Sequence, residues 1–104
     1  MGSRAMSVTD QVLNWTPVGN DQHVTVSNAV KTITPAHADV RFVQLNVQGA
    51  DVRVRMGADP VGGSAGALWK DGSFVYWKKE LLEQARFIRD GGADAVVHVQ
   101  EFAI

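Results

Sequence analysis

Apolar side chains recur at every second position through the middle of the chain, and this spacing constrains the fold more than any other feature. The segment 43–47 reads Val-Gln-Leu-Asn-Val, and 52–56 reads Val-Arg-Val-Arg-Met. A period of two is typical of a β-strand with one buried face. Gly49-Ala50-Asp51 separates the two segments, so we expect them to form a hairpin.

Other short runs of β-branched and aromatic residues predict further strands around turn residues. The first pair is 24–26 and 30–34, separated by Ser27-Asn28, and the second pair is 68–70 and 74–77, separated by Asp71-Gly72. The third pair is a segment through Phe87 and the segment 94–102, separated by Asp90-Gly91-Gly92. Asp-Gly and Gly-Gly steps are strong hairpin signals, so we expect hairpins at the last two turns. The segment 57–66 has four glycines and Pro60, which favour a surface loop without regular structure.

The segment from residue 79 to residue 88 admits two interpretations. Leu81, Leu82, Ala85 and Ile88 fit the stripe of a three-turn helix. Phe87 and Ile88 directly before a Gly-Gly turn are instead typical of a strand, so we expect one helical turn near 79–83 that leads into a strand. About eight short strands result, which predicts an all-β fold: an antiparallel, jelly-roll-like β-sandwich.

Length and composition predict one domain. The chain has 104 residues, of which 45% are hydrophobic and 20% charged, as in ordinary globular domains. Met1 to Ala5 resembles an expression-tag remnant before a native start at Met6, so we expect a single domain over 6–104. The net charge of -1 argues against nucleic acid as a partner, and no apolar run predicts a membrane span or a signal peptide.

The residues that could carry chemistry do not form a recognisable catalytic or metal motif. There are no cysteines, and His23, His37 and His98 lack the spacing of a local chelate. His98 and Glu101 should face opposite sides of one strand. Gly62-x-Ser64-x-Gly66 matches a hydrolase elbow, but the strand-to-helix context of that motif is missing. We therefore expect a protein that is not an enzyme and that has no metal or cofactor.

Apolar residues on both faces of several strands predict a contact with another macromolecule. The outer faces of a monomeric sandwich are exposed to solvent and are usually polar, so strands with apolar residues on both faces favour a homo-oligomer or a docking surface. The alternative is that the N-terminal segment or the short helix covers the second face. The interface candidates are Phe42, Trp69, Tyr76, Trp77, Phe102 and Ile104.

From Val24 onward the order of features resembles small β-sandwich structural proteins of tailed-bacteriophage virions. The shared features are Val-Arg-Val-Arg-Met-Gly at 52–57, Asp59-Pro60 before a glycine-rich loop, Leu-Trp-Lys-Asp-Gly-Ser-Phe at 68–74, Phe-Ile-Arg at 87–89 and Asp-Ala-Val-Val-His-Val at 94–99. Phe102 matches the aromatic residue that follows the last strand in such proteins, and Ala103-Ile104 extend this end with an apolar tail.

The resemblance implies a role in capsid decoration, head completion or tail structure without catalysis. The expected partners are further copies of the chain and the major capsid or other virion proteins, and the expected location is a virion assembled in the host cytoplasm. The alternative is a carbohydrate- or receptor-binding module that stacks Trp69, Tyr76 or Trp77 on a glycan.

Overall fold

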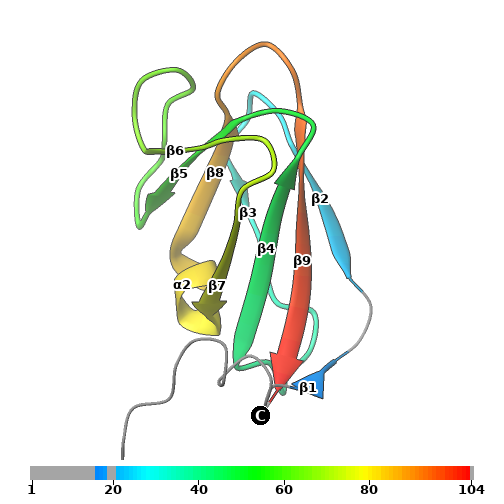
Figure 1. Ribbon diagram of the computed structural model, residues 1–104. Helices are drawn as coiled ribbons and strands as arrows, with labels where there is room; N and C mark the ends of the chain where they lie inside the picture. Colours follow the sequence, from blue (N-terminus) through cyan, green and yellow to red (C-terminus); the bar gives the residue numbers. More distant parts are fainter. Residues whose placement is uncertain (1–15, 19–20, 104) are drawn as a thin grey trace, which may run out of the picture.

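The computed structural model describes residues 16–18 and 21–103, which form two packed antiparallel sheets (Figure 1). Sheet A contains β1 (Thr16–Pro17), β2 (Gln22–Val26), β4 (Phe42–Gln48), β7 (Phe74–Lys78) and β9 (Ala95–Ala103). Sheet B contains β3 (Lys31–Thr32), β5 (Val52–Met56), β6 (Ala67–Trp69) and β8 (Ala85–Arg89). The helix α2 (Lys79–Gln84) connects β7 to β8.

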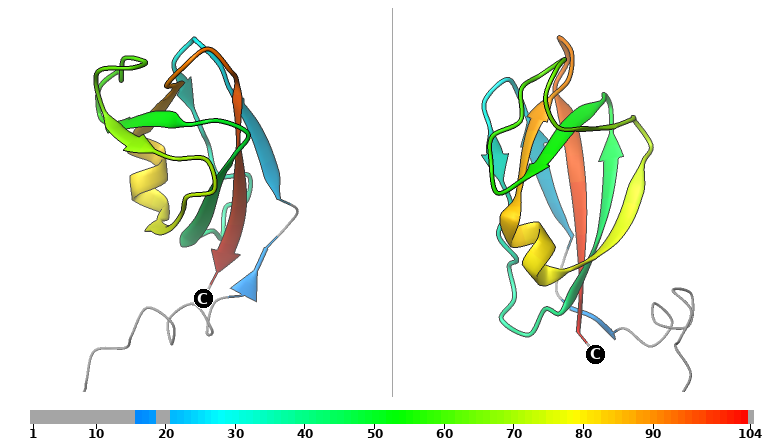
Figure 2. Two further views of the ribbon diagram at one scale, coloured as in Figure 1. Left: turned by 45° about the horizontal axis from the view of Figure 1, so that its top comes forward. Right: turned by 90° about the vertical axis from the view of Figure 1, so that its left-hand side faces the viewer.

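The strand order is that of a jelly roll. Sheet A runs β1-β9-β4-β7, with β2 also paired to β9, and sheet B runs β3-β8-β5-β6. The pairs are nested in sequence: β5 with β6, β4 with β7, β3 with β8, and β2 with β9. A long hairpin rolled into two sheets has this nesting. The predicted all-β, jelly-roll-like sandwich is therefore confirmed, and Figure 2 shows its two layers from the side.

The core lies between the sheets and follows the predicted alternation. Val43, Leu45 and Val47 of β4 are fully buried, as are the alternate residues of the neighbouring strand β9; Val52 and Val54 of β5 are buried in the other sheet, whereas Met56, expected on the same face as they are, is exposed at the end of β5. Phe87 of β8 is the largest fully buried side chain. Because each strand presents one side to the core, the intervening residues form the outer faces of the sandwich.

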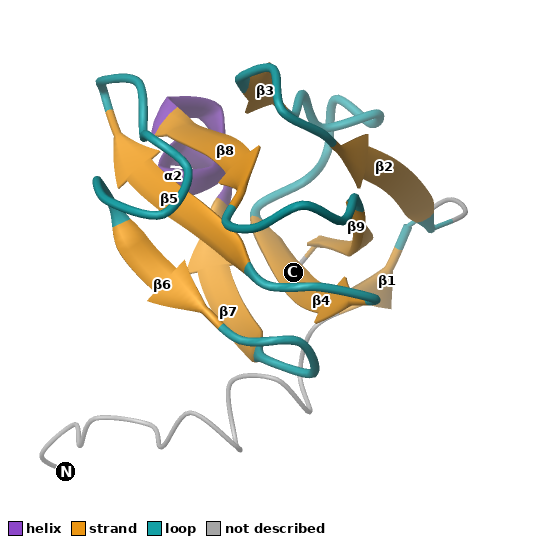
Figure 3. Cartoon of the chain, turned by 90° about the horizontal axis from the view of Figure 1, so that it is seen from above, coloured by secondary structure: helices purple, strands orange, loops and turns teal. Residues whose placement is uncertain are grey.

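The predicted hairpins are wrong. β4 and β5 lie in different sheets, and so do β6 and β7 and the pair β8 and β9. Asp71-Gly72 and Asp90-Gly91-Gly92 do reverse the chain, but each turn carries it from one sheet to the other (Figure 3). Among the described strands, β5 and β6 are the one pair consecutive in sequence that forms a hairpin, and its connection is the glycine-rich segment 57–66.

The ambiguous segment follows the preferred interpretation. Helix α2 is short and is followed by strand β8, as expected. Leu82 of α2 belongs to the buried core, so the helix packs into the lower end of the sandwich and leaves the outer face of sheet A uncovered (Figure 2). β3 is shorter than the strand expected at 30–34. The expected tag remnant, residues 1–5, lies outside the described residues.

Candidate functional site

The strongest candidate surface is the outer face of sheet A, which the strand register defines. Residues directly opposite on paired strands share a face, and the buried alternate residues mark the inner one. The outer face therefore carries Pro17, His23, Thr25, Phe42, Gln44, Asn46, Gln48, Phe74, Tyr76, Lys78, Val96, His98, Gln100 and Phe102.

The charge of this face differs from that of its counterpart on sheet B. Among the outward residues of the strands described in sheet A, Lys78 is the only Lys, Arg, Asp or Glu side chain. The outer face of sheet B carries Arg53, Arg55 and Arg86. A surface depleted in charge and rich in aromatic and amide groups is typical of the buried centre of protein interfaces.

Aromatic and amide side chains contact one another on the outer face of sheet A. The Gln44 Nε2 donates a hydrogen bond to the Tyr76 hydroxyl at 3.2 Å. The Phe74 and Tyr76 rings meet edge to face, with centroids 6.1 Å apart. The Asn46 Oδ1 is buried and lacks a hydrogen-bond partner among the described residues. The face thus has fixed side chains and one acceptor that the described chain does not satisfy.

Two histidines from different strands also meet here. His23 on β2 is directly opposite His98 on β9, and their ring centroids are 4.1 Å apart at 43°. Asn46 on β4 is opposite His98 on the other side. The three residues form a row across three neighbouring strands. His37 lies elsewhere, in the loop before β4.

The structure separates the six predicted interface residues. Phe42, Tyr76 and Phe102 lie together on the outer face of sheet A. The indoles of Trp69 and Trp77 lie on the inner side, where both rings pack against the core and their centroids are 5.1 Å apart. Ile104 lies outside the described residues.

Phe74 is the outer-face residue that sequence reasoning left out. The residue is 59% exposed, the largest value among the exposed large hydrophobic residues described. The alternation had placed it on the same face as Tyr76, so the signal was present. The Asp71-Gly72 turn suggested that Phe74 began one arm of a hairpin, whereas it begins a strand at the edge of sheet A.

A buried carboxylate was also missed. Glu101 has 0% exposure, on the inner side of β9. Its carboxylate accepts hydrogen bonds from the Gln22 Nε2 at 2.7 Å and from the backbone amides of Ala36 at 2.8 Å and His37 at 3.1 Å. It ties the 35–39 loop to β2 and β9. His98 and Glu101 do face opposite sides, as the alternation predicts.

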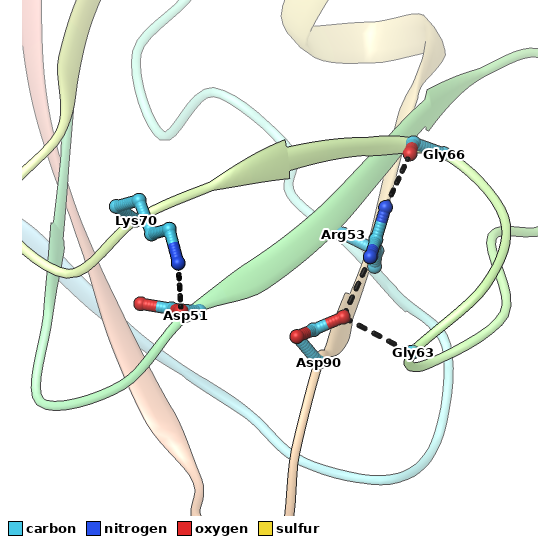
Figure 4. Close-up of polar contacts among 6 residues, drawn as sticks. All are labelled: Asp51, Arg53, Gly63, Gly66, Lys70 and Asp90. Carbon is cyan, nitrogen blue, oxygen red and sulfur yellow. Dashed lines mark hydrogen bonds and ion pairs between the residues drawn. The ribbon is translucent and has the colours of Figure 1, made fainter.

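The upper end of the sandwich is held by ionic contacts (Figure 4). The Asp90 Oδ1 accepts a hydrogen bond from the Arg53 Nε at 2.6 Å and from the Gly63 amide at 3.0 Å. Arg53 also donates to the Gly66 carbonyl at 3.2 Å. The hydrogen bond from Arg53, assisted by that from Gly63, holds the pKa of Asp90 below its usual value against the opposing effect of burial. These contacts pin the 57–66 loop to the turn after β8.

The residues weighed for other chemistry lie apart. Ser64, the centre of the elbow-like motif, is exposed in the 57–66 loop, and its amide donates to the Val61 carbonyl at 3.1 Å. Within the described chain, no three His, Cys, Asp or Glu residues are grouped so that they could hold a metal ion. No described helix is long and apolar enough to cross a bilayer.

Comparison with known proteins leaves the site to be interpreted from its own geometry. No protein-family model, curated protein or solved structure matches the chain.

Proposed function

We propose that this chain is a structural protein of a tailed-phage particle and acts by packing the outer face of sheet A against neighbouring subunits. The observation that carries the proposal is the near absence of charge on that face, where Lys78 is the only such residue on the described strands. Covering aromatic rings and neutral amides costs less hydration free energy than covering charged groups, which would need charged partners of their own.

The proposed partners are further copies of the chain and the major capsid or other virion proteins. Phe42, Tyr76 and Phe102 lie close to one another on this face, with the exposed ring of Phe74 at its edge. Large aromatic side chains are frequent anchors of protein interfaces. Reinforcement of a shell by such contacts requires no catalytic group.

The first test measures association. In sedimentation equilibrium we expect the wild-type chain to self-associate, and we expect Phe74→Lys to weaken the association by about tenfold or more, because it places a charge in the contact. Leu68→Lys is the matched control: Leu68 is also an exposed apolar residue, but it lies on the outer face of sheet B. Equal association of both variants and the wild type would contradict the proposed face.

The virion assignment needs its own test. Mass spectrometry of purified particles produced by a host that carries the gene should detect the chain in fixed proportion to the major capsid protein. Particles that lack it under conditions where the gene is expressed would exclude a virion role and leave the association result standing.

The same face also supports a second candidate function, glycan binding. The Gln44–Tyr76 hydrogen bond fixes an amide beside two aromatic rings, and sugar recognition uses neutral hydrogen-bonding groups next to an aromatic surface. Because Trp69 and Trp77 pack against the core, Phe74 and Tyr76 take the stacking role in this alternative. Binding of a defined glycan by a monomeric wild type, abolished by Phe74→Ala, would favour it over assembly.

A further inference from the structure

We propose that His23 and His98 form a binding site for a divalent transition-metal ion such as zinc, nickel or copper. The two imidazoles stand opposite each other on antiparallel strands, with their centroids 4.1 Å apart. Both lie on the outer face of sheet A, where His23 is exposed and His98 half-buried, so an ion can reach them from solvent. This inference does not depend on the proposed role in a virion.

The spacing of the rings suits a shared ion. Imidazole nitrogens bind zinc at about 2.0–2.1 Å, so two nitrogens on one ion lie about 3–3.5 Å apart. The ring centroids are 4.1 Å apart and the planes are tilted by 43°, so the proposal requires both side chains to turn until one nitrogen of each ring points to the same ion. The strands themselves need not move, because the paired register already places the two residues side by side.

Asn46 supplies an independent observation at the same place. It flanks His98 on β4, on the side away from His23, and its buried Oδ1 lacks a hydrogen-bond partner in the described chain. A histidine that binds a metal through one ring nitrogen generally donates its other N–H to a carbonyl or carboxylate oxygen. The Asn46 Oδ1 is therefore an unsatisfied acceptor on the residue paired with His98, and we propose that it accepts this N–H.

The donor set decides which ions fit. Two imidazoles favour copper, nickel and zinc over magnesium and calcium, which prefer oxygen ligands. Because no third His, Cys, Asp or Glu joins the pair within the described residues, water or a group from another molecule completes the coordination. Such a two-histidine site exchanges its ion readily and should follow the affinity order in which copper exceeds nickel and zinc.

The local charge does not oppose a cation. Among the outward residues of the described strands of sheet A, Lys78 on β7 is the one permanent cation, and β4 and β9 separate β7 from β2. Asp21, an exposed acidic residue, precedes His23 by two residues. Within these strands, no permanent cation adjoins the pair to repel a divalent ion.

The test is calorimetric titration of the full chain with zinc, nickel and copper chlorides after removal of bound metal with a chelator. We expect one ion per chain, with binding that weakens as the pH falls from about 7.5 to about 5.5, since protons compete for the imidazole nitrogens. His23→Gln and His98→Gln should each weaken binding by at least about tenfold. His37→Gln, in the exposed loop before β4, is the matched control and should bind as wild type does.

A second measurement keeps the proposal independent of folding defects. Zinc should raise the melting temperature of the wild type and of His37→Gln, because an ion bound to both histidines links the edge strand β2 to β9. The histidine variants should keep the wild-type circular dichroism spectrum and lose this shift, and Asn46→Ala should weaken binding by about tenfold. Absence of binding at millimolar metal, or undiminished binding by both His23→Gln and His98→Gln, would overturn the proposal.

Discussion

At each end of the sandwich a carboxylate attaches a loop, and the two carboxylates lie in contrasting surroundings. At the lower end Glu101 is fully buried and accepts hydrogen bonds from an amide side chain and two backbone amides. At the upper end Asp90 is partly exposed and is paired with the Arg53 guanidinium. Both attach a loop to a strand end. The comparison indicates that burial, more than the number of contacts, should decide how much stability each anchor contributes.

The largest expected effect is at the buried anchor. Glu101→Ala leaves the Ala36 and His37 amides and the Gln22 side chain without their acceptor at a buried position, so we expect a loss of about 3 kcal/mol or more in the free energy of unfolding. Urea titration followed by circular dichroism measures it. Gln100→Ala, the outward neighbour on β9, is the control. A Glu101→Ala loss below about 1 kcal/mol would contradict the contrast between the ends.

The second-largest loss of stability is expected in the 57–66 loop, which Asp90 attaches to the turn after β8. A Cβ on Gly62 would lie 2.7 Å from the Arg89 carbonyl oxygen, a backbone atom that cannot easily move. Gly62→Ala should therefore destabilise the protein by about 1–3 kcal/mol. Gly91→Ala is the matched control, because a Cβ there meets nothing within 4 Å. Equal melting temperatures of the two variants would show that the 57–66 loop does not need its close contact with β8.

The ion pair between Asp90 and Arg53 should contribute less to stability than Glu101 does, and its contribution should depend on pH. Asp90→Asn removes the charge that pairs with Arg53, so it should lower the melting temperature by less than Glu101→Ala does. The pKa of Asp90 is lowered from 3.8 in the folded state, so its contribution is present above that value and is lost as the pH falls below it. The difference between wild type and Asp90→Asn should therefore be larger at about pH 6 than at about pH 2.5. A constant difference would mean that the ion pair contributes nothing.

The smallest effects on stability are expected on the outer faces. Phe74→Lys and Leu68→Lys alter exposed side chains outside the core, so each should change the free energy of unfolding by no more than about 0.5 kcal/mol. Chemical denaturation at a concentration where the protein is monomeric measures this. A large loss in Phe74→Lys alone would mean that this residue supports the fold, and its effect on association could no longer be assigned to a contact surface.

Much of the strand layout was predictable because it rests on local physics. The alternation at 43–47 and 52–56 identified both strands and their inward residues, except that Met56 is exposed where β5 ends. Helix formers followed by Phe87-Ile88 indicated a short helix and then a strand. The pairing was not predictable in the same way. A turn such as Asp71-Gly72 specifies that the chain reverses, but the partner of the next strand depends on contacts with distant segments.

Prediction of the candidate site residues was limited in the same way, because burial of a side chain depends on contacts with distant segments. The alternation placed Phe42 and Phe102 opposite the main apolar face of their strands and left open which face of 74–77 is buried; the structure puts Tyr76 on the same outer face as Phe42 and Phe102. Trp69 and Trp77 were chosen by residue type, yet the packing of the two sheets uses both indoles within the sandwich. Glu101 was considered only as a partner for His98, because a glutamate near the end of a chain gives no local sign of burial.

The amino-acid sequence by itself determined where strands form and which side of each strand is apolar, because both follow from the two-residue period of the pleated backbone. Only the tertiary structure decided that the turns connect two sheets, that Glu101 is buried and that His23 meets His98. Those outcomes depend on which distant strands become neighbours, and that choice is made by burial of the whole apolar surface at once, not by any local segment.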